Sequence, residues 1–162
     1  MNFMKKIKFL FDMHKQGKLE LTEPSEEMKT SYMNKAESNI ESAKILLNSE
    51  KLEESVSMSY FGMYHSILSL FFMCGIKSEN HSASIIILKE IFEEPELFNE
   101  ISFAKKERID KQYYIDFILT LKDTDEMIKK AENFSNMIKI KLRNMSNKGI
   151  EDIRKKLMEA MS

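Results

Sequence analysis

The chain has 162 residues, of which 31% are charged, and its formal net charge is −1. This length suits one domain that buries a continuous core without a metal or a disulfide, so we treat residues 1–162 as a single domain. The balanced charge excludes a chain-wide basic field for nucleic acid or an anionic membrane, so any contact with RNA must be local. Four Gly and two Pro predict an all-α fold, because these residues punctuate sheets and tight turns.

Apolar periodicity and capping residues divide the chain into helices. A short amphipathic helix at the N-terminus ends at Gly17, and a long one begins after Pro24. Further along, Pro95 can open a short helical piece, and Asp110 is expected to cap the helix that follows it. The predicted helices cover residues 2–16, 26–48, 52–75, 81–92, 95–106, 110–145 with a possible break at 120–125, and 150–161.

The central predicted helix contains twenty-two residues, 55–76, without an Asp, Glu, Lys or Arg. A charge-free stretch in so charged a chain must be buried on nearly every side. It has the length of a membrane span, but five Ser, two Tyr and a His make it a poor one. Four small residues recur along one face and predict close packing of another helix: Ser59, Gly62, Ser66 and Ser69.

Familiar catalytic and cofactor signatures are missing from the sequence. The three histidines are far apart and no H-E-x-x-H pattern occurs, so we predict no metal site. Neither a Gly-rich phosphate loop nor a G-x-S-x-G nucleophile motif is present, and we predict no cofactor. The single cysteine, Cys74, excludes an intrachain disulfide and fits a reducing compartment, so we expect a soluble, cytoplasmic protein without membrane contact.

Three polar positions stand out, and each has an ordinary alternative. His65 lies in the charge-free run, where a structural histidine with a hydrogen-bond partner is the simpler explanation. His81 follows Asn80 at a helix start, where a capping turn would suffice. Arg108 is one of three Arg among twenty-five basic residues and precedes Lys111, which predicts a phosphate-binding site. A solvent-exposed segment of charged residues would give the same sequence pattern.

These positions, taken in order, resemble the HEPN domain family, named for higher eukaryotes and prokaryotes nucleotide-binding. The small prokaryotic branch carries an aromatic pair, a small residue, and then an aromatic residue and His on a buried helix. The present chain has Tyr60, Phe61, Gly62, Met63, Tyr64 and His65 there. An apolar stretch closing on Gly75, the pair His81 and Ser82, and Arg108 five residues before Tyr113 complete the pattern. The likeness spans a core of about residues 26–142.

The resemblance implies an up-and-down helical bundle, here with an additional helix at each terminus. It also implies a homodimer that works with a minimal nucleotidyltransferase in a toxin–antitoxin pair. Active members of the family cut RNA without metal, using an Arg and a His four to six residues later. Arg108 matches that Arg, whereas Tyr113 stands where the His would be. A tyrosine of ordinary pKa, about 10, is a poor general base near neutral pH.

Two functions are therefore weighed. The first is a binding subunit that holds a nucleotide or RNA phosphate without cutting it. The second is a metal-independent toxin ribonuclease that uses Arg108, and we leave open whether the protein is an enzyme. The candidate catalytic residues are Arg108 and Tyr113, and the candidate ligand-binding residues are Arg108, Lys111, His65, His81, Tyr60 and Tyr64.

Overall fold

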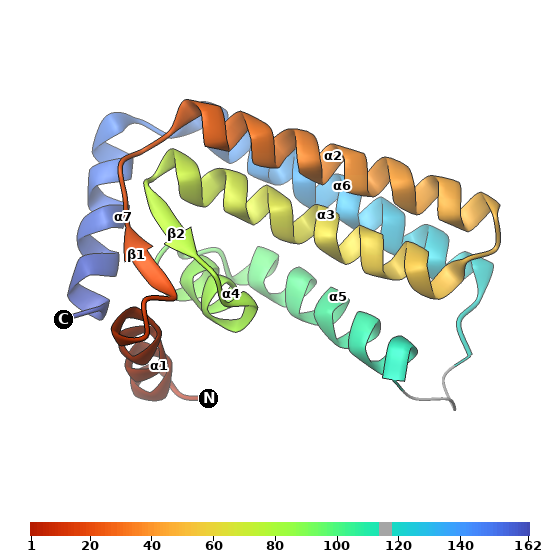
Figure 1. Ribbon diagram of the computed structural model, residues 1–162, viewed down its shortest axis with the longest axis horizontal. Coiled ribbons are helices and arrows are strands. Elements are labelled where there is room, and N and C mark those ends of the chain that lie inside the picture. The colour runs from red at the N-terminus through yellow and green to blue at the C-terminus, as the bar shows by residue number, and fades with distance from the viewer. Residues whose placement is uncertain (114–117) are drawn as a thin grey trace.

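The computed structural model describes residues 1–113 and 118–162, with the side chains of 1–109 and 118–162. Helices dominate these residues, and two short strands accompany them (Figure 1). The elements in chain order are α1 (Phe3–Lys15), β1 (Leu19–Leu21), α2 (Glu26–Asn48), α3 (Leu52–Met73), β2 (Ile76–Ser78), α4 (His81–Glu90), α5 (Pro95–Tyr113), α6 (Leu121–Asn144) and α7 (Asn147–Ala160). The prediction of an all-α bundle is confirmed.

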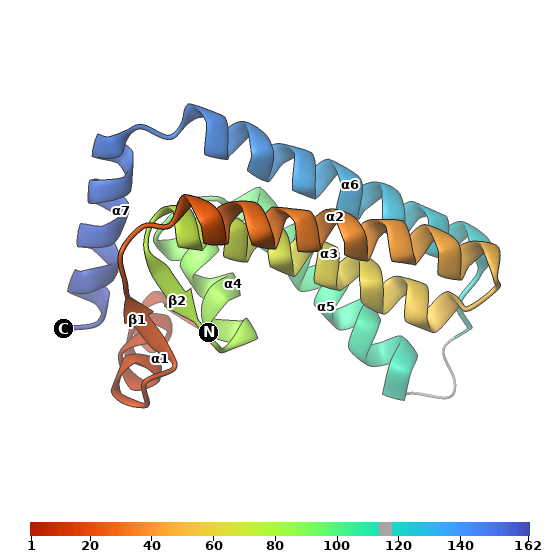
Figure 2. The same ribbon diagram turned by 45° about the horizontal axis from the view of Figure 1, so that its top comes forward.

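Helix α3 forms the centre of a bundle with α2, α5 and α6, which run alongside it in both views (Figures 1 and 2). More than half of its side chains are buried, including Tyr60, Ile67 and Phe71, which have no exposed surface. The charge-free run is therefore the core helix that its composition predicts, because removing so much apolar surface from water is the main stabilising contribution to the fold.

The seam of small residues on α3 packs against α2 of the same chain. A Cβ atom added to Gly62 would lie 2.6 Å from Cγ1 of Ile40 on α2, so only glycine allows this approach. Two serine hydroxyls on α3 also donate to backbone carbonyls of α2, from Ser69 to Lys29 at 2.7 Å and from Ser55 to Ala43 at 2.7 Å. The seam is thus used to bring two neighbouring helices together.

Side-chain caps set most of the helix starts. Ser25, Asn80, Thr120 and Ser146 each accept a hydrogen bond from a backbone N–H in the first turn of α2, α4, α6 and α7. The predicted cap at Asp110 is wrong: α5 begins at Pro95 and continues to Tyr113. No Gly or Pro interrupts the sequence between Pro95 and the start of α6, so nothing in this stretch ends the helix at residue 109.

The terminal helices are held by the two-stranded antiparallel sheet, in which Leu19 pairs with Ser78 and Leu21 with Ile76. On α7, Nη1 of Arg154 donates to the carbonyl oxygens of Thr22 at 2.7 Å and Cys74 at 2.9 Å. These contacts hold α7 against the chain just after β1 and just before β2. None of the helices in the described part of the chain has the length and apolar character that crossing a membrane would require.

Candidate functional site

Aromatic and basic side chains gather where α3, α4 and α5 meet. Tyr60, Phe61 and Tyr64 come from α3, His81 is the first residue of α4, and Arg108 comes from α5; we call these five residues the Arg108 cluster. The ring of His81 stacks on that of Tyr64 with centroids 3.8 Å apart, and the guanidinium carbon of Arg108 lies 4.8 Å from the centroid of Phe61. Tertiary packing thus joins residues that are up to 48 positions apart in the sequence.

Arg108 is held by rings and leaves hydrogen-bonding capacity unused. Its guanidinium carbon also lies 5.4 Å from the centroid of Tyr60, a distance at which a cation is attracted to the ring face. Among the described residues, its buried Nε atom has no hydrogen-bond partner and no carboxylate forms an ion pair with it. A guanidinium fixed in this way can offer its remaining N–H groups to a phosphate or carboxylate.

His81 is a neutral imidazole that is hydrogen-bonded to Tyr60. Burial, and then the positive charges of Lys105 and Arg108, lower its pKa from the ordinary 6.5. Burial raises the pKa of Tyr60, so this phenol keeps its proton at neutral pH. The Tyr60 hydroxyl lies 2.7 Å from Nδ1 of His81, and in the tautomer that carries its proton on Nε2 the imidazole accepts this hydrogen bond. His81 can then donate a hydrogen bond from Nε2 to a ligand.

His65 lies beside the Arg108 cluster, with its ring centroid 6.0 Å from that of Phe61. Its Nδ1 lies 2.6 Å from Oδ1 of Asn39 on α2; this oxygen can only accept, so Nδ1 carries the proton. Burial, followed by the charge of Lys35, lowers the pKa of His65 to about 4. This supports the simpler explanation of His65 as a structural histidine with a hydrogen-bond partner.

His65 is not tuned to act as a base near neutral pH. An efficient general base has a pKa close to the working pH, and the pKa of His65 is lowered to about 4. Tyr64 is also a poor base, because burial raises its pKa and its hydroxyl lies 3.3 Å from the Ser84 hydroxyl. The described side chains are better suited to holding an anion than to moving a proton.

The structure brings most of the predicted site residues together. Tyr60, Tyr64, His81 and Arg108 contact one another, and His65 adjoins them through Phe61. The predicted residues Lys111 and Tyr113 have side chains outside the described residues.

Sequence reasoning missed Lys105, whose Nζ donates to the Ser82 hydroxyl at 2.9 Å, and Asn39, which orients His65. The spacing of Lys105 three residues before Arg108 on a helix could have identified it, because such residues share a face. No comparable local signal marks Asn39, which reaches His65 from a different helix.

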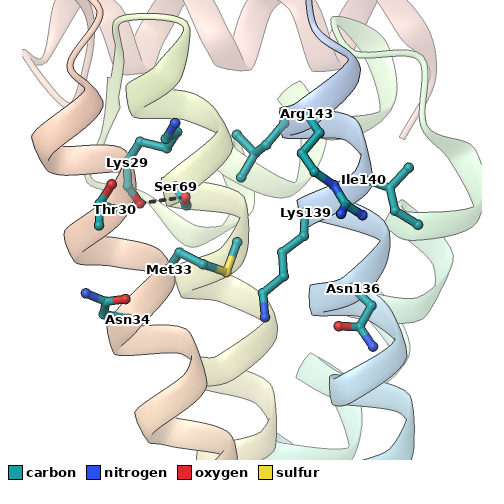
Figure 3. Close-up of a pocket in the computed structure, with 10 residues that line it drawn as sticks. Lys29, Thr30, Met33, Asn34, Ser69, Asn136, Lys139, Ile140 and Arg143 are labelled. Atoms are coloured by element: carbon teal, nitrogen blue, oxygen red, sulfur yellow. Dashed lines mark hydrogen bonds between the residues drawn. The ribbon is translucent and has the colours of Figure 1, made fainter.

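A separate groove of about 700 Å³ runs between α2 and α6 with Ser69 of α3 at its floor (Figure 3). Lys29 and Lys139 on its sides are ion-paired with Glu26 and Glu37. The groove has no lining residue in common with the Arg108 cluster. Two of its three cations are therefore neutralised, the third being Arg143, and it is the weaker candidate for an anion site.

The described residues contain no group of His, Cys, Asp and Glu that could hold a metal ion. Comparison with curated proteins finds no match. The family model of the HEPN domain matches residues 30–141, which run from the first turns of α2 to near the end of α6 and include the whole Arg108 cluster. This match covers more than half of the chain, and the chain therefore belongs to the HEPN domain family.

Proposed function

We propose that this HEPN protein binds the phosphate of a nucleotide or of RNA through Arg108 and does not cleave its ligand. Membership of the family supports a function related to nucleotides or RNA. The observation that carries the proposal is the guanidinium of Arg108, which is held over Tyr60 and Phe61 with its buried Nε unpartnered. A preorganised guanidinium loses little side-chain entropy when it binds a phosphate.

The neighbours of Arg108 supply the other contacts that a phosphate needs. His81 offers its Nε2 proton, and the ammonium group of Lys105 lies at the same edge, close enough to lower the pKa of His81. A bound phosphate would oppose the effect of these cations, so binding should raise the pKa of His81. The ligand's charge is then balanced by Arg108 and Lys105, and its oxygens accept from three different side chains.

The absence of cleavage is inferred from the proton-transfer groups. The sequence carries Tyr113 where active relatives are expected to have a histidine, and burial lowers the pKa of both His65 and His81. Cleavage of RNA without metal needs a group that removes the proton of the 2′-hydroxyl. The alternative function, a ribonuclease, retains one supporting observation, which is the same guanidinium of Arg108, whose Nε has no hydrogen-bond partner among the described residues.

A binding measurement and a cleavage measurement test the proposal together. Arg108→Ala should weaken the binding of adenosine 5′-monophosphate by about 10- to 100-fold, because charge-assisted hydrogen bonds are lost. Arg143→Ala is the matched control, since Arg143 is an exposed arginine on α6 outside the cluster. Mixed RNA incubated with the protein in EDTA should stay intact. If the RNA is degraded and Arg108→Ala alone stops this, the ribonuclease is the correct function.

The partners are part of the same proposal. The resemblance supports a homodimer that works with a minimal nucleotidyltransferase in a toxin–antitoxin pair. Because α2 covers the seam of Ser59, Gly62, Ser66 and Ser69, a dimer would have to use another surface. Sedimentation at tens of micromolar tests the dimer, and co-purification with a nucleotidyltransferase encoded beside this protein tests the partner. A monomer, or a neighbouring nucleotidyltransferase that does not bind, would contradict the respective part.

A further inference from the structure

A second cavity, of about 430 Å³, lies between α1, α4 and α5. Its apolar walls come from Ile85 and Ile86 of α4 and from Phe98 and Ile109 of α5. Lys105 also lines it, together with Lys106, Ser82 and Lys6. We call it the Ile109 pocket. Its volume lies within the range of about 300–1,000 Å³ that is typical of sites for small organic molecules.

Two residues that line the Ile109 pocket, Lys105 and Ser82, are close in sequence to members of the Arg108 cluster. Lys105 and Ser82, which are joined by a hydrogen bond of 2.9 Å, line the pocket. Ser82 directly follows His81, and Lys105 lies one helical turn before Arg108. Burial, and then the charge of Arg108, lowers the pKa of Lys105, because the two cations lie near each other. A ligand that reached from Arg108 into the pocket could therefore contact Lys105 and Ser82.

Two of the three lysines that line the pocket are available to an anion. Within the described residues, neither Lys105 nor Lys106 has an ion-pair partner, whereas Lys6 is paired with Glu90 at 2.6 Å. Ile85 and Ile86 are buried, but Ile109 is 37% exposed, so it is the most open of the three isoleucines in the pocket wall. Cations beside an apolar cavity match a phosphate joined to a flat apolar ring, which is the chemistry of a nucleotide unit.

We propose that the Ile109 pocket receives the base of the nucleotide adjacent to the one held by Arg108. The ligand is then a single-stranded polynucleotide of at least two units, with its bridging phosphodiester at Lys105 and Ser82. This inference rests on the proposed function and extends it, because it selects a strand over a free mononucleotide. Helix α1, which contributes Lys6, lies outside the residues that the family model matches.

Three ligands separate the contribution of the second base from that of the added phosphate. The probes are adenosine 5′-monophosphate, the ribodinucleotide pApA, and the same dinucleotide with an abasic second unit. Stacking or burial of a base contributes enough to strengthen binding by about tenfold. We therefore expect pApA to bind the full chain about tenfold more tightly than its abasic form in isothermal titration at fixed salt.

Ile109→Asn makes the open wall of the pocket polar and should bring pApA and its abasic form to nearly equal affinity. Phe103→Asn is the matched control, because Phe103 is 45% exposed on the same helix and does not line the pocket. Far-ultraviolet circular dichroism checks that both variants are folded. If Ile109→Asn does not fold, Lys106→Gln, at an exposed position, takes its place and should weaken pApA more than the monophosphate.

The possible failures are distinguishable. Equal binding of pApA and its abasic form by the unmodified protein would overturn the Ile109 pocket as a base site, while loss of monophosphate binding in Arg108→Ala would still support the proposed function. Equal effects of Ile109→Asn and Phe103→Asn would overturn it as well. If Arg108→Ala leaves the binding of all three ligands unchanged, the proposed function itself is wrong.

Discussion

Replacing Gly62 by Ala tests how the central helix is packed against α2. The added methyl group would lie 2.6 Å from Cγ1 of Ile40 and 3.3 Å from the carbonyl oxygen of Ala36. Carbon atoms pack best about 3.5–4.0 Å apart, so Ile40 has to move by about 1 Å. Ile40 is only 7% exposed and adjoins Asn39, which holds the ring of His65.

Two opposing contributions set the size of the effect. Ala is favoured over Gly inside a helix by about 1 kcal/mol. Overpacking of a tight core costs about 1–3 kcal/mol. We therefore expect Gly62→Ala to lower the free energy of unfolding by about 1 kcal/mol. In an Ile40→Ala background the nearest obstacle is gone, so the same substitution should instead raise the free energy of unfolding by up to about 1 kcal/mol.

Urea unfolding of the four proteins of this double-mutant cycle, followed by circular dichroism, measures both values. Ile40→Ala alone should cost about 2–5 kcal/mol, which leaves a marginally stable protein and makes low temperature preferable. The decisive result is the change of sign between the two backgrounds. Stabilisation by Gly62→Ala in the unmodified protein, or the same cost in both backgrounds, would refute the argument that Ile40 excludes a side chain at residue 62.

Three further predictions concern other parts of the chain. Gly75 has a φ of +67°, and an added Cβ would overlap the carbonyl oxygen of Thr22, so Gly75→Ala should lower the free energy of unfolding by more than about 3 kcal/mol. Gly17 has a φ of +69° and open space around it, so Gly17→Ala should lower the free energy of unfolding by only about 1 kcal/mol. Burial, and then a nearby lysine, lowers the pKa of His65 to about 4, below its ordinary 6.5. The unfolded chain therefore binds the proton at a higher pH than the folded protein does, and the free energy of unfolding falls as the pH falls from about 6.5 toward 4. Solvent screening at this half-buried ring reduces the loss to about 1–2 kcal/mol, and His65→Gln should lose correspondingly less stability between pH 7.5 and 4.5; equal losses would contradict the burial argument. The Thr120 hydroxyl accepts a hydrogen bond from a backbone N–H at 3.0 Å in the capping box of α6. Thr120→Ala should therefore lower the free energy of unfolding in urea by about 1 kcal/mol, whereas Thr120→Ser should be nearly neutral. A similar cost for both substitutions would argue against the cap.

Local features of the sequence predicted most of the helices and several of their ends. Ser25, Asn80 and Pro95 act within one turn of their own positions, so their effect on α2, α4 and α5 is visible in the sequence. The misplaced cap at Asp110 shows the limit of this reasoning, because an N-cap residue type inside a helical pattern does not by itself end the preceding helix.

The sequence by itself determined that the chain is helical and that α3 is buried, because composition, periodicity and capping depend only on neighbours along the chain. Only the tertiary structure decided which elements pack against the buried helix. The three-residue strands are too short to be recognised before they pair, and Arg154 reaches the carbonyl of Thr22 across 132 positions of sequence. The position of the Arg108 guanidinium over Phe61 depends on the docking of α5 against α3, which the local pattern of neither helix contains.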